Sequence, residues 1–315
     1  MTFEMNRRSL LLKAAAMAAA AGGYRVAGAQ DEAADDRPNG QDFVTPAALE
    51  TKDVYTFLVL GLDTRPDDAE LNTDVMMVSR VNLAENTVRT MSFPRDLYVE
   101  IPGVGPDKIN AAFKAVAENG HEQWMQGMSA TRATFEHNFG LTIDAAMSIR
   151  FEGVEAVVDL LGGVTVENPY DLADDSYPTL DYGTKEIFYP AGIIELNGEQ
   201  ALEFMRTRHQ DGDDGRVMRQ QLVVTDLLLA AQEPENVAKL PELVEIGREH
   251  VITNIPTEVQ MQLATAIPNI PVENVFWGTI THLLWGDVVT GGMWVYQGDW
   301  NQLPGYVQGF LNGEI

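Results

Sequence analysis

Segments with the apolar pattern of strands alternate along this chain with segments of helical period, and this alternation restricts the fold more than any other feature. Strands are predicted over residues 55–62, 74–81, 87–93, 143–150, 164–166, 275–280 and 294–296. Helices are predicted over residues 109–118, 122–137, 154–161, 199–205, 218–231, 235–246, 258–267 and 302–311. The acidic, tyrosine-rich segment 168–182 is expected to be a loop. Because interleaved helices can cover both faces of a sheet, the predicted fold class is α/β, an α/β/α sandwich with a mixed central sheet and hairpin excursions.

The composition is that of a folded chain with an acidic surface. Of its 315 residues 45% are hydrophobic, which is ample for a core. The 47 acidic residues outnumber the 21 Lys and Arg residues, for a net charge of −26. This charge argues against nucleic acid as a partner, because phosphate contacts need a basic face, and against docking on an anionic bilayer by surface charge. The lack of cysteine in the sequence excludes disulfides and thiolate chemistry.

The N-terminal residues have the pattern of an export signal. Arg7 and Arg8 precede an alanine-rich stretch that ends in Ala27-Gly28-Ala29. We therefore predict a signal peptide of the twin-arginine type over 1–29, a polar linker over 30–50 and a single catalytic domain over 51–315. The protein is expected to be exported to the cell envelope, and to be membrane-associated if the signal is not cleaved. The apolar stretch is about ten residues long, too short to span a bilayer.

The few cations of the chain are clustered. Arg65 and Arg95 each follow a predicted strand, and four more arginines fall within fourteen residues: Arg206, Arg208, Arg216 and Arg219. Guanidinium groups bind phosphate bidentately, so the cluster indicates a compact anionic ligand. The alternative is a set of surface salt bridges with the aspartates of the same segment.

Two aspartates occupy the ends of predicted strands. Asp63 closes the strand 55–62, and Asp74 opens the strand 74–81. Carboxylates beside an arginine cluster suit a Mg²⁺-bound pyrophosphate, because Mg²⁺ takes oxygen ligands and commonly combines one or two carboxylates with phosphate oxygens. The alternative is that each aspartate caps a turn.

Eight segments in a fixed order resemble the LytR-CpsA-Psr family of cell-envelope phosphotransferases, from residue 56 to about 231 and more weakly to the C-terminus. The first four are Leu60-Gly61-Leu62-Asp63-Thr64-Arg65, Thr73-Asp74-Val75-Met76-Met77, Ser92-Phe93-Pro94-Arg95-Asp96-Leu97 and Lys108-Ile109-Asn110-Ala111-Ala112. The others are 157–164 (VVDLLGGV), 196–202 (LNGEQAL), 206–208 (RTR) and 213–221 (DDGRVMRQQ). The resemblance implies an α/β/α fold. It also implies transfer of a glycopolymer from a polyprenyl-pyrophosphate carrier to peptidoglycan with Mg²⁺, or Mn²⁺ in its place.

The resemblance also implies roles for individual residues. The metal ligands would be Asp63 and Asp74, and the catalytic residues Arg65, Arg95, Asp96, Arg206 and Arg208. The pyrophosphate would be held by Arg65, Arg95, Lys108, Arg206, Arg208, Arg216, Arg219 and Gln220. The lipid chain, through which the protein would meet the membrane surface, could lie along Met76, Phe113, Phe135, Val157 and Leu222, unless these are ordinary core residues.

The sequence departs from the family pattern at residue 72, where Asn72 replaces the usual arginine. The loss of a charged phosphate donor leaves two alternatives open. One is a pyrophosphatase acting on lipid or nucleotide pyrophosphates, with water as the acceptor; the other is a non-catalytic binder of polyprenyl phosphate or pyrophosphate. A structural wall protein is a third, which leaves the arginine cluster unexplained. Asp96 is a candidate general base, or it orients Arg95 by a salt bridge.

Overall fold

The computed structural model describes residues 49–63, 72–115, 121–179, 183–230, 234–237, 239–266 and 270–315. The predicted signal peptide, nearly all of the predicted linker and Arg65 lie outside these residues. None of the helices in the described ranges is both long enough and apolar enough to cross a bilayer.

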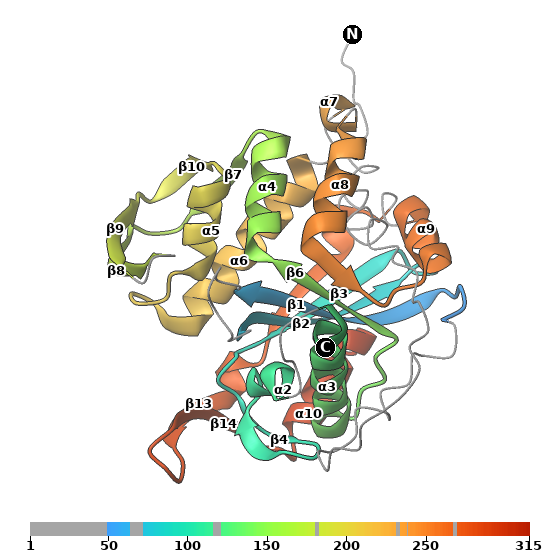
Figure 1. Ribbon diagram of the computed structural model, residues 1–315, viewed down its shortest axis with the longest axis vertical. Coiled ribbons are helices and arrows are strands. Elements are labelled where there is room, and N and C mark those ends of the chain that lie inside the picture. The colour runs from blue at the N-terminus through green and yellow to red at the C-terminus, as the bar shows by residue number, and fades with distance from the viewer. Residues whose placement is uncertain are drawn as a thin grey trace.

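A six-stranded mixed sheet forms the centre of the domain, as predicted (Figure 1). Its strands, in spatial order, are β11 (Val251–Thr253), β6 (Ala145–Arg150), β1 (Val54–Asp63), β2 (Asn72–Asn82), β3 (Thr87–Phe93) and β12 (Val275–Thr279). The β1–β6 and β3–β12 pairs are parallel, and the other three pairs are antiparallel. The β2–β3 hairpin turns at Asn86, whose φ of 53° lies in the left-handed region that asparagine tolerates.

Helices cover both faces of this sheet. The lower face in Figure 1 carries α2 (Ala111–Lys114), α3 (His121–Phe139) and α10 (Leu303–Asn312). The upper face carries α4 (Phe151–Leu161), α5 (Gly198–Arg206), α6 (Gly212–Ala230), α7 (Pro234–Val237), α8 (Leu240–His250) and α9 (Thr257–Ala266). The main core lies under the sheet, where the ring of Phe93 meets those of Phe135 and Phe139 at centroid distances of 4.8 and 4.9 Å. Aromatic packing of this kind fixes the helices against the strands and so holds the strand ends in place.

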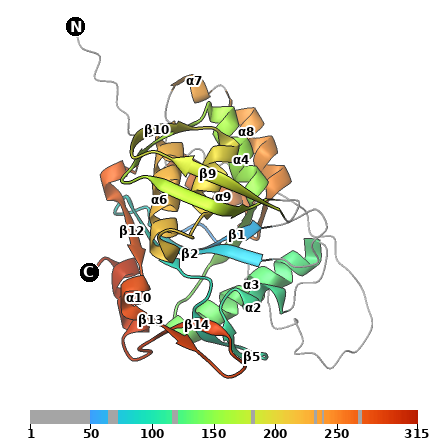
Figure 2. The same ribbon diagram turned by 90° about the vertical axis from the view of Figure 1, so that its left-hand side faces the viewer.

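Small hairpins project from the sandwich. Two of them pack beside α5 and α6: β7 (Val164–Asn168) with β10 (Gly192–Leu196), and β8 (Leu172–Pro178) with β9 (Thr184–Tyr189). Two more lie at the lower end in Figures 1 and 2: β4 (Tyr98–Ile101) with β5 (Gly105–Lys108), and β13 (Leu284–Val288) with β14 (Trp294–Gly298). Single 3-10 turns occupy Val272–Asn274 and Thr281–Leu283.

Three predicted elements were wrong. The expected loop 168–182 contains β8 and leads into β9, because buried Asp174 is hydrogen-bonded and hides the apolar alternation of the strand. The expected helix 235–246 is two helices, α7 and α8, and Gly247 lies inside the second of them. Helix α6 begins at Gly212, six residues before its predicted start, and this early start places Arg216 on the helix together with Arg219.

Candidate functional site

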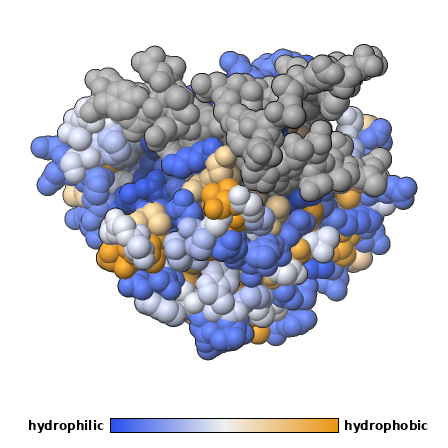
Figure 3. Space-filling model, turned by 60° about the horizontal axis from the view of Figure 1, so that its bottom comes forward, coloured by the Kyte–Doolittle hydropathy of each residue, from blue (hydrophilic) through white to orange (hydrophobic). Residues whose placement is uncertain are grey.

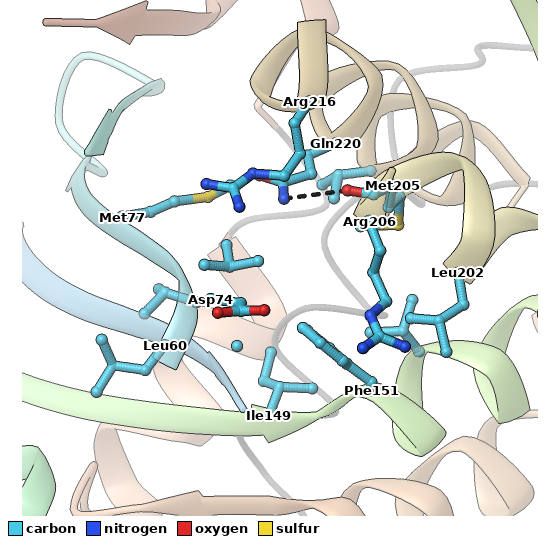
Figure 4. Close-up of a pocket in the computed structure, with 15 residues that line it drawn as sticks. Leu60, Asp74, Met77, Ile149, Phe151, Leu202, Met205, Arg206, Arg216 and Gln220 are labelled. Atoms are coloured by element: carbon cyan, nitrogen blue, oxygen red, sulfur yellow. Dashed lines mark hydrogen bonds between the residues drawn. The ribbon is translucent and has the colours of Figure 1, made fainter. Parts of the chain in front are cut away.

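A pocket of about 110 Å³ lies between the upper face of the central sheet and helices α4, α5 and α6 (Figure 4). Its polar lining residues are Asp74, Arg206, Arg216 and Gln220. The rest of the lining is Val59, Leu60, Gly61, Val75, Met77, Ile149, Phe151, Val154, Leu202, Met205 and Val224. The pocket therefore combines a charged end with an apolar wall.

A β-bulge points Asp74 into this pocket. Gly61 pairs with Val75, but the next residue of β1, Leu62, pairs with Thr73, so Asp74 is the extra residue of β2. A bulge turns the side chain of its extra residue out of the normal alternation. Asp74 therefore lines the pocket beside Val75, a strand neighbour that would otherwise face the opposite side. Gly61 allows the close approach, because a Cβ there would lie 2.8 Å from the Cβ of Val75.

Asp74 belongs to a network of ion pairs at the strand ends. The guanidinium of Arg95 pairs with Asp74, and its Nε lies 3.7 Å from the Asp96 carboxylate. The Asp96 carboxylate also pairs with the Nζ of Lys108 at 2.7 Å and with Arg208 at 3.6 Å. Burial would lower the pKa of Arg95, but the negative charges of Asp74 and Asp96 outweigh burial and raise it. The network keeps Arg95 charged beside Asp74, which lines the pocket.

Arg216 enters the pocket from the first turns of α6. Its side chain is nearly buried and pairs with Asp213 at 3.0 Å on the same helix, and Figure 4 shows its guanidinium on the side of the pocket facing Asp74. Burial lowers the pKa of Arg216 despite the opposing attraction of Asp213 and Asp74. Within the described part of the chain, the buried Nε–H groups of Arg95 and Arg216 have no hydrogen-bond acceptor. Buried donors of this kind favour an anionic ligand that supplies the acceptors.

Arg206 and Gln220 complete the polar end of the pocket. Arg206 is the last residue of α5, and its guanidinium lies over the ring of Phe151 at 5.1 Å and donates to the Tyr177 hydroxyl at 3.4 Å. The amide of Gln220 donates to the carbonyl oxygen of Met205 at 3.3 Å, a bond drawn in Figure 4. A capping box at the start of α5 sets where this helix begins and therefore where Arg206 emerges.

Arg219 is placed differently from the other predicted arginines. Its side chain is fully buried behind the pocket and does not line it. The Nε donates to the carbonyl oxygen of Phe204 at 2.7 Å, and the two terminal nitrogens bond the carbonyl oxygen of Thr207 and the carboxylate of Asp211. Asp211 also accepts from the Tyr170 hydroxyl at 2.6 Å. All three nitrogens of this guanidinium therefore hold the segment between α5 and α6.

Asp174, on β8, holds the same segment from the other side. Its buried carboxylate accepts a hydrogen bond from the Thr207 hydroxyl and lies 2.7 Å from the Nδ1 of His209. The backbone N–H of Ser176 donates to it at 3.0 Å. Arg208 lies in the chain between Thr207 and His209, the two residues that the Asp174 carboxylate contacts. Asp174 therefore positions a residue of the ion-pair network.

The contacts of Asp174 predict a pH dependence of stability. Burial would raise the pKa of Asp174, but the hydrogen bonds from Thr207 and His209 outweigh burial and hold it below the ordinary 3.8. The stabilisation is therefore present above that value and is lost as the pH falls through the lower pKa of the folded state. Asp174→Asn is expected to be less stable than the wild type at pH 7, with a gap in unfolding free energy that narrows below about pH 4. Urea unfolding across pH measures this gap.

The matched control is Asp175→Asn, which changes the exposed neighbour on the same strand. The unfolding free energy of this variant is expected to equal that of the wild type at every pH. A gap for Asp174→Asn of constant size from pH 7 to acid conditions would contradict the assignment.

The structure brings most of the predicted site residues together. Asp74, Arg206, Arg216 and Gln220 line the pocket, and the network of Arg95, Asp96, Lys108 and Arg208 adjoins it through Asp74. None of the five predicted lipid contacts lines the pocket. Met76, Phe113 and Phe135 lie in the core under the sheet, and Val157 and Leu222 pack against two smaller core clusters. The apolar wall comes from residues missed by sequence reasoning, mainly Ile149, Phe151, Leu202, Met205 and Val224. The alternation of β2 was a signal for part of this wall. Met76 and Met77 are neighbours in a strand and face opposite sides of the sheet, so only one of them can face the pocket.

The residues at the strand ends fit a hexacoordinate cation that binds together with a phosphate ligand. The backbone of Asp63 pairs with Asn72, two residues before Asp74, so the two predicted ligands belong to one end of the β1–β2 ladder. The described residues contain no group of three or more acidic, His or Cys side chains able to hold a metal by themselves. Mg²⁺ does not need such a cage, because it commonly takes one or two carboxylates and completes its shell with phosphate oxygens and water.

Comparison with known proteins identifies the family of this chain. The model of the LytR_cpsA_psr family matches residues 19–306. The chain belongs to this family. A polyisoprenyl-teichoic acid–peptidoglycan teichoic acid transferase, TagU of Oceanobacillus iheyensis, is 32% identical over 233 residues, which are 73% of this chain and 68% of TagU.

A second relative of the same kind has a solved structure. TagV of Bacillus subtilis is 29% identical over 240 residues, which are 74% of this chain but 58% of TagV. The crystal structure of B. subtilis TagV superposes with a TM-score of 0.63 at 23% identity, covering 84% of this chain and 99% of the TagV chain. This LytR_cpsA_psr protein therefore has the fold of its relatives, while its match to them spans about three fifths to two thirds of their curated length.

Proposed function

We propose that this LytR_cpsA_psr protein is a phosphotransferase of the cell envelope that moves a glycopolymer from a polyprenyl-pyrophosphate carrier to peptidoglycan. The observation that carries the proposal is a pocket in which the buried Nε–H of Arg216, which has no acceptor among the described residues, lies together with an apolar wall. A pyrophosphate needs the arginine donor, and a polyprenyl chain needs the apolar wall. The names of the relatives TagU and TagV support the same donor and acceptor.

The pocket residues have separate tasks in this reaction. An acceptor hydroxyl of the wall glycan attacks the phosphorus nearest the sugar and a new P–O bond forms. The P–O bond to the bridging oxygen breaks, polyprenyl phosphate leaves with that oxygen, and the hydroxyl proton passes to the leaving phosphate or to water. Arg95, Arg206 and Arg216 bind the phosphoryl oxygens and stabilise the charge that develops on them and on the leaving phosphate. The lipid chain lies along the wall that includes Ile149 and Phe151.

A divalent cation, Mg²⁺ or Mn²⁺, would be held by Asp63 and Asp74. Bound there, it would supply charge stabilisation for the pyrophosphate oxygens. Asp74 also pairs with Arg95, so the carboxylate orients this arginine.

Asp96 acts by orienting cations in this proposal. Its two carboxylate oxygens contact Arg95, Lys108 and Arg208, which leaves the carboxylate shared among three cations of the site. This arrangement favours the orienting role over that of a general base, because the oxygens are already engaged by cations. Asn72 adds no charge to the site, and Arg216 supplies a buried guanidinium on the opposite wall.

The proposal is tested with the full chain, a polyprenyl-pyrophosphate disaccharide and Mg²⁺, by measuring the release of polyprenyl phosphate. Asp74→Asn is expected to slow release by about 10²-fold or more, because it removes a metal ligand and frees Arg95. Chelation of divalent cations is expected to stop release by the wild type. Asp175→Asn, which changes an exposed carboxylate, serves as the control and should not alter the rate.

The products separate the alternatives. Recovery of the disaccharide phosphate on an added peptidoglycan fragment supports transfer. Its recovery only as the free phosphate indicates a pyrophosphatase. Tight binding of the donor without release under any divalent cation would overturn the enzymatic proposal in favour of a binder.

A further inference from the structure

The β13–β14 hairpin carries aromatic side chains that the proposed reaction does not use. Its register pairs Gly286 with Tyr296 and Val288 with Trp294, so these four side-chain positions share one face. Trp285 belongs to the opposite face. Figures 1 and 2 show the hairpin projecting at the lower end of the molecule.

Trp294 is held in place although it is 45% exposed. A Cβ at Gly286 would lie 3.0 to 3.3 Å from the indole atoms Cζ2, Nε1 and Cε2, so the glycine leaves the space that the indole occupies. On the next position of the same face, the ring of Tyr296 meets the indole edge-to-face at a centroid distance of 4.7 Å. The pair, which we call the aromatic platform, is therefore ordered before any ligand binds.

The platform is joined directly to the ion-pair network. The backbone N–H of Tyr296 donates to the carbonyl oxygen of Asp96 at 2.9 Å, and Leu97 forms a β-bridge with Tyr296. Burial raises the pKa of the Tyr296 hydroxyl, and the charges of Asp213, Asp214 and Asp96 raise it further. The charges of these carboxylates therefore act on the Tyr296 end of the platform.

The platform and β6 lie toward different sides of the site. The lipid wall runs from β2 and α6 across β1 to β6 and the helices α4 and α5, whereas β14 is attached at Asp96, which follows β3 on the other side of β1 and β2. In phosphoryl transfer the nucleophile enters roughly in line with the leaving group. With the lipid phosphate leaving along the wall, the acceptor enters from the platform side.

We propose that Trp294 and Tyr296 bind a pyranose ring of the acceptor glycan at the entrance of the pocket, a subsite that rests on the transferase function proposed above. The C–H face of a pyranose is apolar and packs on an indole, while its hydroxyls donate to carboxylates. The aromatic platform offers the first kind of contact, and the exposed carboxylate of Asp214, whose charge acts on the Tyr296 hydroxyl, offers the second.

A membrane surface fits this patch less well. Figure 3 shows hydrophobic clusters separated by hydrophilic surface. Asp287 lies on the hairpin itself, and the chain as a whole has a net charge of −26. Anionic lipid repels such a surface, whereas a neutral sugar does not.

The test uses the full chain and a soluble β-1,4-linked tetramer of N-acetylglucosamine as the probe, with binding followed by calorimetry or ligand-observed NMR. Trp294→Ala is expected to weaken binding by about tenfold, because the sugar loses its packing surface. Trp294→Phe keeps an aromatic ring and should stay within about threefold of the wild type. The matched control is Trp285→Ala, which removes an indole of similar exposure, 51%, from the opposite face of the same hairpin and should leave binding unchanged.

Two further measurements make failure informative. Release of polyprenyl phosphate from the donor tests the transferase function itself, and it should survive in Trp294→Ala while the KM for the peptidoglycan fragment rises. Equal tetramer binding by wild type and Trp294→Ala would overturn the sugar subsite without touching donor cleavage. The second measurement is sedimentation with anionic vesicles. If Trp294→Ala and Trp285→Ala both lose sedimentation while sugar binding is unchanged, the hairpin binds the membrane and the sugar subsite is wrong.

Discussion

Replacing Arg216 with alanine is expected to lower the rate of donor cleavage by about 10²- to 10³-fold, the largest functional effect of any single side chain in the pocket. Arg216 is nearly buried, faces Asp74 across the pocket, and has an Nε–H that no described residue accepts. A bound pyrophosphate would receive this donor in a low-dielectric site, where a charge-assisted hydrogen bond is strongest. Arg216→Lys keeps the charge but not the planar fork, and is expected to recover only a small part of the rate.

The measurement is single-turnover release of polyprenyl phosphate, paired with thermal unfolding. Because Arg216→Ala strands the buried carboxylate of Asp213, the double variant Asp213→Asn, Arg216→Ala is the control for folding. It should regain the melting temperature without regaining the rate. Recovery of both would show that Arg216 serves the fold and not the phosphates.

Replacing Arg219 with alanine is expected to lower the free energy of unfolding by about 3–5 kcal/mol, the largest stability effect. The substitution opens a cavity and removes a fully buried guanidinium from the carbonyl oxygens of Phe204 and Thr207 and from the carboxylate of Asp211. The two buried carbonyl oxygens are left without their donor, and the partly buried carboxylate loses its cation. Urea unfolding at pH 7 measures the loss.

The control is Arg248→Ala, which removes an exposed arginine from its pair with Glu245 and should change stability by less than about 1 kcal/mol. Restoring the Arg219→Ala fold with a stabilising osmolyte should return most of the donor-cleavage rate. A stable Arg219→Ala protein with abolished cleavage would show instead that Arg219 binds phosphate, as the sequence pattern alone suggested.

The sequence predicted the fold class from local period alone. Strands such as β1 and helices such as α3 and α10 carry uninterrupted patterns, and their positions were predicted within a few residues. The pattern failed where a buried polar group replaced an apolar residue. Asp174 made β8 look like a loop, because a hydrogen-bonded carboxylate can occupy a core position that sequence reasoning reserves for apolar side chains.

Local sequence also determined which residue types the site contains. Guanidinium groups bind phosphate and carboxylates bind cations, so their presence at strand ends and in the Arg206–Arg219 segment indicates phosphate chemistry. Only the tertiary structure decided which of these groups face the pocket. The bulge at Asp74 and the early start of α6 bring Asp74 and Arg216 together, while the same helix buries Arg219 behind them. Strand register and helix phase are set by long-range packing. A shift of one residue in either of them turns a side chain from the pocket to the core.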